Sequence, residues 1–411
     1  MDDIVVGIDV GTTKTCTLVA RVEQDDSLRI MGVGIEPSEG IRKGVIVDLT
    51  SASQSIARSI IQAEQTSGVK IVTALVSLAG AHVSSVNSRG VVTVSGQKVE
   101  EMDIERAMNA ARGVAIPSNR EIIHVIQRGF SLDGQDGIHQ PVGMHGYRLE
   151  VEAHVITAAT ATAENLRQAV GATGVNVAQF VLNPLASAEV VLSDTERTMG
   201  AVVCDIGGGT TDLAIYVNGD VWHTMVLAVG GNHITQDIAA GLRLPINQAE
   251  EIKKLYGYAV QSEVGLDETF SIQPFGTESP IRLSRRDLSL IIEARVEEIF
   301  DLALQEIKRS GYDGLLPAGM ILTGGTSLLP GIRQLASKVL GMPVRTAQPE
   351  KLLGLADKLN SPAYSTSVGL LSWAAALQSL PVASQKKGPK QPKGDGENWN
   401  TVKNLLKRLI P

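Results

Sequence analysis

Two short segments of the sequence repeat one arrangement of residues that is suited to binding phosphate and a metal ion. Residues 7–15 (GIDVGTTKT) and 205–212 (DIGGGTTD) each place an aspartate at the end of an apolar run, followed by glycine and paired threonines. Glycine lets backbone N–H groups approach phosphate oxygens closely, and threonine hydroxyls add further donors. Mg²⁺ in such sites binds with one or two carboxylates, phosphate oxygens and water. The repeat therefore predicts that two related halves of the chain bind a nucleotide between them.

The residues on either side of the two glycine turns indicate what kind of phosphate site they form. Apolar runs rich in β-branched residues precede both turns and resume after them, at 16–19 and 213–217. Each turn is therefore predicted to join two buried strands. A dinucleotide-binding unit would need a helix there, and no Gly-x-x-x-x-Gly-Lys-[Ser/Thr] of a P-loop occurs in the sequence. One such turn alone is as easily an ordinary hairpin, but two copies in matching frames favour a duplicated phosphate clamp.

A third glycine segment completes the pattern. Residues 319–331 (GMILTGGTSLLPG) run from a hydrophobic strand into two glycines, which leave a flat surface for a base or ribose. In this order, the three segments resemble those of the actin-like ATPase superfamily, and the likeness to the bacterial FtsA family covers nearly the whole chain. The resemblance implies an α/β fold of the actin-like, ribonuclease H-like kind. Such a fold has two nucleotide-binding lobes, here with an inserted α+β subdomain and a C-terminal amphipathic helix.

The resemblance implies ATP and Mg²⁺ as cofactors. We expect Asp9 and Asp205 to hold the metal largely through its waters and Asp212 to order a metal-bound water. Asn183 stands where MreB has a glutamate and actin a glutamine. Because its amide is a poor base, ATP turnover is expected to be slow at most. The other nucleotide contacts are expected at Gly11, Thr12, Thr13, Lys14, Gly207, Gly208, Gly209, Thr210, Gly230, Gly231, Glu250, Lys253, Gly324, Gly325, Thr326 and Ser327.

The segment between the second turn and the third glycine segment leaves two interpretations open. Glu250 and Lys253 are three residues apart and share one face of an expected helix, which usually means a solvated surface pair. In the family, an Ala-Glu-x-x-Lys pattern, here at 249–253, contacts the adenosine instead. An earlier helix is expected to begin near Thr235, and its first N–H groups could face a phosphate or ribose.

The division of the chain into subdomains also follows from the resemblance. The stretch 83–163 has strand patterns at 122–127 and 148–156 and a helix that Asp103 could cap, so an inserted module is favoured over a decorated surface loop. The expected parts are a first lobe (1A) at 1–82, 164–198 and 360–380, the module (1C) at 83–163, a second lobe (2A) at 199–230 and 301–359, a small subdomain (2B) at 231–300, a linker at 381–397 and an amphipathic helix at 398–411.

The end of the sequence predicts a membrane anchor. Residues 384–397 contain two prolines, three glycines and no apolar side chain, and therefore cannot bury enough surface to fold. Apolar residues then recur at helical spacing with cations beside them, which suits an anionic lipid surface. Docking of this helix on its own body or on a partner is the alternative. The anchor residues are Trp399, Val402, Leu405, Leu406, Leu409 and Ile410, flanked by Lys403, Lys407 and Arg408.

Composition narrows the class of protein. A formal charge of −7 argues against nucleic acid as a partner, and 411 residues predict two or more lobes. Cys16 and Cys204 lie in apolar runs and are expected to be small buried residues of a reducing compartment. We expect no signal peptide, no membrane span and no histidine metal site.

Together these features predict a peripheral protein on the cytoplasmic face of the cell membrane at the division site. The resemblance implies self-association into filaments, binding of the C-terminal tail of FtsZ at subdomain 2B and contact with later division proteins through 1C. The alternative is an actin-like adaptor of another membrane machine, such as the type IV pilus protein PilM. A small-molecule kinase would need a substrate pocket in the cleft, and nothing in the sequence marks one. A DnaK-type chaperone would need a longer chain after residues 366–377.

Overall fold

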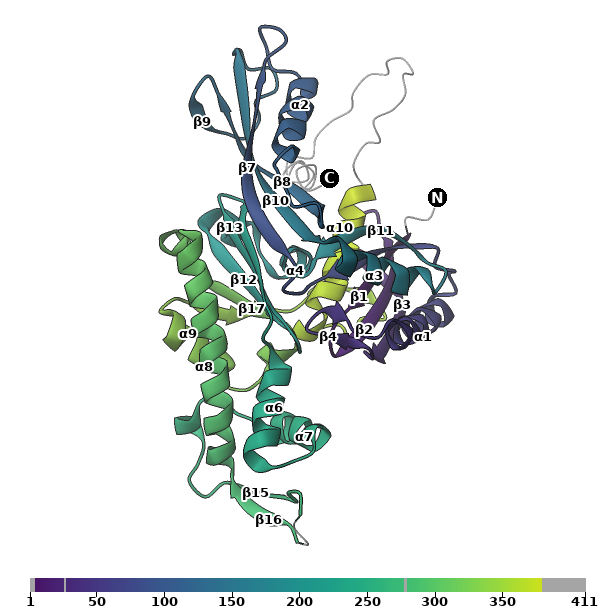
Figure 1. Ribbon diagram of the computed structural model, residues 1–411, viewed down its shortest axis with the longest axis vertical. Coiled ribbons are helices and arrows are strands. Elements are labelled where there is room, and N and C mark those ends of the chain that lie inside the picture. The colour runs from purple at the N-terminus through teal and green to yellow at the C-terminus, as the bar shows by residue number, and fades with distance from the viewer. Residues whose placement is uncertain (1–3, 26, 277–278, 379–411) are drawn as a thin grey trace.

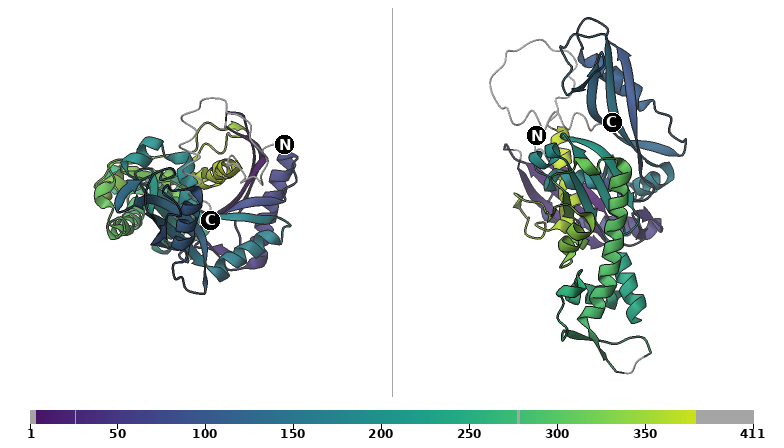
Figure 2. Two further views of the ribbon diagram at one scale, coloured as in Figure 1. Left: turned by 90° about the horizontal axis from the view of Figure 1, so that it is seen from above. Right: turned by 90° about the vertical axis from the view of Figure 1, so that its left-hand side faces the viewer.

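The computed structural model describes residues 4–25, 27–276 and 279–378. Two α/β lobes lie side by side, with an inserted module at one end of the molecule and a small subdomain at the other (Figure 1). In Figure 2, the left view looks down the long axis, and the right view shows the module and the small subdomain at opposite ends from another side. Among the described residues, no helix combines the length and apolar composition needed to cross a membrane. The expected amphipathic helix at 398–411 lies outside the described residues.

The first lobe is built on a six-stranded sheet with the order β11-β6-β1-β2-β3-β19. β1 and β2 form an antiparallel hairpin, and β6 runs parallel to β1. The central strands are nearly continuous apolar runs because α1 packs on one face of the sheet and α10 on the other. The elements are β1 (Ile4–Val10), β2 (Lys14–Val22), β3 (Leu28–Pro37), β4 (Ile41–Arg42), β5 (Val45–Ile46), α1 (Leu49–Ser67), β6 (Thr73–Leu78), α3 (Thr160–Gly171), β11 (Asn176–Leu182), α4 (Asn183–Val191), β19 (Leu353–Gly354), η4 (Pro362–Tyr364) and α10 (Ser365–Gln378).

The second lobe repeats this topology on a five-stranded sheet with the order β14-β13-β12-β17-β18. β12 and β13 form the antiparallel hairpin, and β17 runs parallel to β12 as β6 does to β1. The predicted strand–turn–strand reading of both glycine segments is confirmed. The elements are α5 (Asp194–Met199), β12 (Ala201–Ile206), β13 (Thr211–Val217), β14 (Asp220–Leu227), α8 (Arg285–Ser310), η2 (Asp313–Leu315), β17 (Met320–Thr323), η3 (Gly325–Leu328), α9 (Ile332–Leu340) and β18 (Val344–Thr346).

The inserted module has a four-stranded sheet, ordered β7-β10-β8-β9, and a hydrophobic core of its own under α2. Helix α2 begins at Glu101, so Asp103 lies in its first turn rather than at its cap, although its carboxylate still accepts from the Glu100 amide (3.0 Å). The module is therefore more than a surface loop. Its elements are β7 (Ser84–Thr93), α2 (Glu101–Arg112), β8 (Arg120–Leu132), β9 (Gln135–Ile138) and β10 (Arg148–Ala159).

The small subdomain extends from the second lobe at the end opposite the module (Figure 1). Its first helix begins at Gly231, four residues before the position expected from the sequence, because backbone bonds to the β12–β13 turn extend it. The stretch 256–280 contains one strand of a short hairpin. The elements are α6 (Gly231–Leu242), α7 (Ile246–Tyr256), η1 (Gln261–Glu263), β15 (Thr269–Ile272) and β16 (Ile281–Ser284).

Candidate nucleotide-binding site

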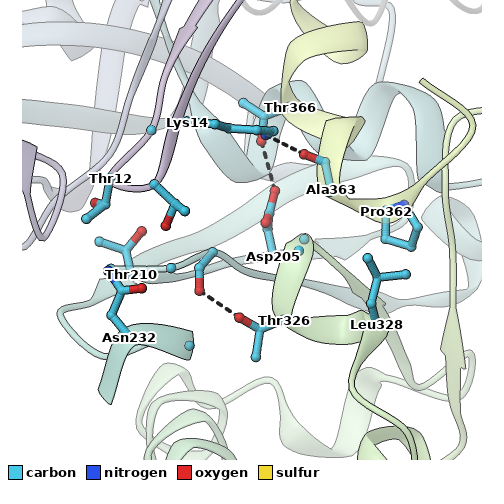
Figure 3. A pocket seen from close by; sticks show the side chains of 18 of the residues that line it. Thr12, Lys14, Asp205, Thr210, Asn232, Thr326, Leu328, Pro362, Ala363 and Thr366 are labelled. Atoms are coloured by element: carbon cyan, nitrogen blue, oxygen red, sulfur yellow. Dashed lines mark hydrogen bonds between the residues drawn. The ribbon is translucent and has the colours of Figure 1, made fainter. Parts of the chain in front are cut away.

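A cavity of about 430 Å³ lies between the lobes, where the two hairpin turns and the third glycine segment meet (Figure 3). Most of the residues predicted from the sequence line it, although they come from strands and helices far apart in the chain. Ser327 and Gly230 do not line it. The Ser327 hydroxyl is buried and donates to the Gly324 carbonyl (2.7 Å). The predicted residues that line the cavity are Asp9, Gly11, Thr12, Thr13, Lys14, Asn183, Asp205, Gly207, Gly208, Gly209, Thr210, Asp212, Gly231, Glu250, Lys253, Gly324, Gly325 and Thr326.

The two hairpin turns have the same backbone structure. The Gly11 amide donates to the Lys14 carbonyl (3.0 Å), and the Gly207 amide donates to the Thr210 carbonyl (2.9 Å). Each turn follows a buried aspartate, which is the penultimate residue of β1 in one lobe and of β12 in the other. The sequence repeat is therefore a structural repeat, and its two copies present equivalent groups to the cavity.

Asp205 is held by hydroxyls of the two helices that link the lobes. Ser187 of α4 and Thr366 of α10 both donate to its Oδ2 (2.5 and 2.9 Å), and Figure 3 shows the second of these bonds. Its other oxygen, Oδ1, lies against Gly324, where a Cβ would come within 2.4 Å. Gly324 also has a φ of +87°, a conformation that favours glycine. The third glycine segment is thus fitted closely to the second aspartate.

Asp9 is fixed in a similar way from the first lobe. Its carboxylate accepts from the hydroxyls of Ser77 on β6 (3.0 Å) and Ser367 on α10 (2.7 Å). Because each carboxylate is bonded to α10, this helix sets the position of both aspartates. The expected metal ligands therefore sit on a rigid support before any ligand binds.

Lys14 points along the cavity toward the junction between η4 and α10. Its ammonium donates to the Ala363 carbonyl (2.6 Å; Figure 3). It also lies 4.7 Å from the centre of the Tyr364 ring. The same group is 3.9 Å from the Asp9 carboxylate. A lysine held in this manner places a positive charge at the wall of the cavity, which suits an anionic ligand.

Burial and mutual repulsion perturb the carboxylates of the second hairpin. Burial raises the pKa of Asp205, and the nearby Asp9 raises it further. Burial raises the pKa of Asp212 well above its ordinary range, with Asp205 adding to the effect. Oδ1 of Asp212 and Oδ1 of Asn183 are buried without a hydrogen-bond partner, and both residues line the cavity. Unpaired buried acceptors beside destabilised carboxylates fit a bound cation with its water.

Within the described residues, no group of three or more histidine, cysteine, aspartate or glutamate side chains is arranged to hold a metal ion. Both cysteines are free and buried, as predicted.

The tips of the two hairpins touch across the mouth of the cavity. A Cβ on Gly208 would lie 2.0 Å from the Thr13 hydroxyl, and one on Gly209 would lie 2.4 Å from the Thr12 hydroxyl. Thr12 in turn accepts from the Gly44 amide (3.0 Å). The lobes are therefore closed on each other in this structure, and only glycine allows the second turn to approach the first so closely.

Glu250 and Lys253 are not a solvated pair. The Lys253 ammonium lies 2.6 Å from the Glu250 carboxylate and also donates to the Thr235 hydroxyl (2.8 Å) and the Gly231 carbonyl (3.1 Å). The Lys253 side chain is only 13% exposed, and both residues line the cavity. Of the two readings of this pair, the structure thus favours the one that places it at the site.

The start of α6 is bonded to the second hairpin. The Gly231 and Asn232 amides donate to the Gly207 and Gly208 carbonyls (3.0 and 2.7 Å), and the Thr326 hydroxyl donates to the Gly207 carbonyl (2.9 Å). These first amides of α6 are therefore engaged within the protein and do not point freely at a ligand. They join the hairpin, the small subdomain and the third glycine segment into one wall.

Several lining residues were missed at the sequence level. The residues of the η4–α10 junction follow no sequence pattern that would mark them as lining a site. A threonine in an apolar helix, for example, looks like a packing residue. Asn232 could have been predicted, because it directly follows two glycines that were themselves predicted to bind the nucleotide. The missed lining residues include Gly44, Ala79, Asn232, Ile234, Lys254, Leu328, Leu329, Pro330, Pro362, Ala363 and Thr366.

Two lobes of one topology, closing a pair of equivalent hairpins on a shared cavity, define an actin-like protein, and the expected fold class is confirmed. Solved structures agree. The PilM-PilN type IV pilus biogenesis complex matches with a TM-score of 0.64 at 17% identity, over 90% of this chain and 98% of that one. MreB5 of Spiroplasma citri bound to ADP matches with a TM-score of 0.53 at 17% identity, over 89% of this chain and 95% of that one. At these identities the likeness concerns the fold alone.

Sequence comparison identifies the family within this class. The model "Cell division protein FtsA" matches residues 202–369, and "SHS2 domain inserted in FTSA" matches residues 80–157. The cell division protein FtsA of Pseudomonas aeruginosa is 42% identical over 92% of this chain and 90% of its own length. The chain belongs to the FtsA family of cell division proteins, and the resemblance read from its three glycine segments is confirmed.

Proposed function

We propose that the chain binds ATP with Mg²⁺ in the cleft between its lobes. The observation that carries this proposal is the pair of equivalent hairpins, each supplying a buried aspartate to one cavity. Asp9 and Asp205 would hold the ion through its waters, and the cation would neutralise the Asp205 carboxylate, whose burial raises its pKa. The turns at 11–14 and 207–210 would hold the phosphates. Support for an adenine nucleotide comes from the fold neighbour MreB5 of Spiroplasma citri, described as bound to ADP or AMPPNP.

The nucleotide would act mainly as a conformational and polymerisation switch. Hydrolysis needs a group that orients the attacking water, and Asn183 offers only an amide at the cavity wall. Asp212 could order a water but is buried and holds its proton strongly. Slow turnover follows, while closure of the lobes on the nucleotide requires no chemistry.

We also propose that the chain polymerises on the cytoplasmic face of the membrane at the division site and tethers FtsZ there. Membership of the FtsA family supports this cellular role. Exposed apolar side chains on the small subdomain support binding of a partner tail: Leu255, Leu266 and Phe275 are 72%, 75% and 66% exposed. Single exposed apolar residues are common on surfaces, but several on one small subdomain suit a binding face. The inserted module would contact later division proteins, and residues 398–411 would bind the lipid.

An adaptor of the type IV pilus remains the alternative raised by the sequence. The PilM-PilN complex resembles this chain in fold, at 17% identity, whereas the FtsA relative is 42% identical. The family evidence therefore favours division over the pilus.

Co-sedimentation with anionic vesicles and Mg·ATP tests the role directly. The full chain is compared with a chain ending at residue 384, with FtsZ in parallel tubes. We expect only the full chain, and not the shortened one, to pellet with the vesicles and to carry FtsZ with it. Pelleting without FtsZ would contradict the tether, and equal pelleting of the two chains would contradict the anchor.

A further inference from the structure

The inserted module belongs to the first lobe by chain connection but also packs on the second. It leaves the first lobe after β6 and returns to it through α3 and β11. Its strands β7, β8 and β10 nevertheless all contact β14, the edge strand of the second-lobe sheet. Figure 1 shows the inner ends of these strands reaching the two lobes together. The module thus bridges the lobes from outside the nucleotide cavity.

A buried histidine makes the first connection between module and second lobe. His154 on β10 is 1% exposed, and Thr224 on β14 is 3% exposed. The His154 ring bonds to the Asn87 amide oxygen through Nδ1 (2.7 Å) and to the Thr224 hydroxyl through Nε2 (2.9 Å). Since an amide oxygen only accepts, Nδ1 carries the proton and Nε2 accepts from Thr224. The Ser85 hydroxyl adds a bond to the Thr224 carbonyl (3.1 Å).

This connection does not depend on pH near neutrality. Burial, with smaller contributions from nearby His223, Arg128 and His124, lowers the pKa of His154 to about 3. The ring therefore stays neutral, and its acceptor nitrogen remains available to Thr224.

Arg128 on β8 makes the second connection, to Trp222, which lies two residues before Thr224 on β14. The Arg128 guanidinium of β8 stacks 3.9 Å from the centre of the Trp222 ring and donates to the Tyr312 hydroxyl (3.2 Å). Trp222 and Tyr312 also pack edge to face, with centroids 5.1 Å apart. Arg128 is 7% exposed, so this cation–π contact is largely shielded from water. The β13–β14 pairing shifts register at Trp222, and both Trp222 and Thr224 contact the module.

β14 leads directly from these contacts to the nucleotide cavity. Val226 pairs with Asp212 and Leu227 with Thr211 on the neighbouring strand. The Thr211 hydroxyl then donates to the Val229 carbonyl (2.9 Å), next to the glycines that open α6. A shift of β14 relative to the module would therefore move residues that line the cavity.

We infer that the contacts of His154 and Ser85 with Thr224, and of Arg128 with Trp222 and Tyr312, form a latch that couples the module to the nucleotide cleft. The inference rests on the proposed binding of ATP. With the latch in place the lobes cannot rotate apart unless the module moves with the second lobe or the latch breaks. Since the hairpin tips are in contact in this structure, the latch favours the closed cleft. By linkage, a partner that repositions the module would change the affinity for nucleotide, and the nucleotide would change the affinity for that partner.

The test compares Thr224→Val with Ser88→Ala in the full chain. Thr224→Val keeps the volume of the side chain but removes the hydroxyl that donates a hydrogen bond to His154 Nε2. Ser88 lies on β7, as Ser85 does, but its hydroxyl donates to the Ala111 carbonyl inside the module (2.8 Å), which makes it the matched control. Ser85→Ala removes a latch bond from the module side, at a half-buried residue, and serves as a milder second variant. Thermal unfolding establishes that each variant is folded.

Two readouts are needed. The first is the distance distribution between spin labels at Gln135→Cys in the module and Gln305→Cys on α8, which are exposed sites, while the native cysteines are fully buried. The second is the affinity for a fluorescent ATP analogue with Mg²⁺. We expect Thr224→Val to broaden the distance distribution and to weaken the affinity about fivefold or more. Ser88→Ala should match the parent in both.

A Thr224→Val chain with the parental distance distribution would overturn the latch. A broadened distribution with parental affinity would overturn its coupling to the cleft. If the proposed function is wrong, the parent itself will bind no nucleotide. That result differs from both outcomes above, and it would also contradict the coupling.

Discussion

Asp212 occupies the position in the second hairpin that Cys16 occupies in the first. Cys16 pairs with Asp9 across the β1–β2 hairpin, and Asp212 pairs with Asp205 across β12–β13. The two copies of the motif are therefore equivalent in backbone but not in charge. Only the second carries an additional buried carboxylate, and that carboxylate has an oxygen without a hydrogen-bond partner. Such a group destabilises the ligand-free fold and is best explained by a ligand that uses it.

Asp212→Asn is expected to stabilise the ligand-free protein while weakening the binding of Mg·ATP. Burial raises the pKa of Asp212, so the native state holds this proton more tightly than the unfolded chain. The parent therefore loses stability as the pH rises from the ordinary value of 3.8 through the raised pKa. The variant lacks this loss, and its advantage in melting temperature should grow across that window to a few degrees at pH 8.

Differential scanning fluorimetry from pH 5 to 8 without nucleotide measures this difference. A variant that melts below the parent at pH 8 would show that the carboxylate stabilises the fold. Titration with Mg·ATP at pH 8 completes the comparison, with weaker binding expected for the variant.

Close contact between the two linking helices, α4 and α10, is the feature at the scale of elements that most constrains the site. A Cβ on Gly369 of α10 would lie 1.9 Å from the Ala186 carbonyl of α4. These helices also carry the hydroxyls that hold both aspartates. A larger residue at 369 would separate the helices and disturb the carboxylates as well as the core.

We expect Gly369→Ala to destabilise the protein by roughly 1–3 kcal/mol, because overpacking outweighs the better helix propensity of alanine. Gly171→Ala in α3 is the control, since nothing lies within 4 Å of its added methyl group. That substitution should be neutral or stabilise by up to about 1 kcal/mol. Urea unfolding followed by circular dichroism compares the two, and equal midpoints would contradict the close-contact argument.

The sequence predicted elements well where a repeated local pattern existed, and less well where tertiary contacts decided. Both hairpins followed from the aspartate, glycine and threonine order, because that order is local. The early start of α6 did not, because it depends on bonds from Gly231 and Asn232 to a turn more than twenty residues away. The roles of Ser187 and Thr366 were equally hidden, since each looks like a small packing residue until the lobes are assembled.

At the scale of the whole molecule, charge is distributed unevenly along the chain. The full sequence has a net charge of −7, yet residues 384–411 contain seven lysine or arginine residues against Asp395 and Glu397. An anionic surface would therefore repel the rest of the chain and attract this segment. Under the proposed anchoring, the same asymmetry orients the molecule, with its C-terminal residues toward the lipid and its lobes away from it.

Binding to anionic vesicles should consequently depend on the cations beside the apolar residues and on salt. Lys403→Gln with Lys407→Gln is expected to weaken binding by about tenfold or more, at about 1 kcal/mol for each cation near the surface. The matched control is Lys386→Gln with Lys387→Gln, which removes equal charge farther from the apolar residues and should cost less. Because the Debye length falls from about 10 Å at 0.1 M salt to about 3 Å at 1 M, added salt should weaken the parent more than the first variant. Equal losses for the two double variants, measured by vesicle co-sedimentation, would mean that the cations act only through net charge and that residues 399–410 do not meet the lipid.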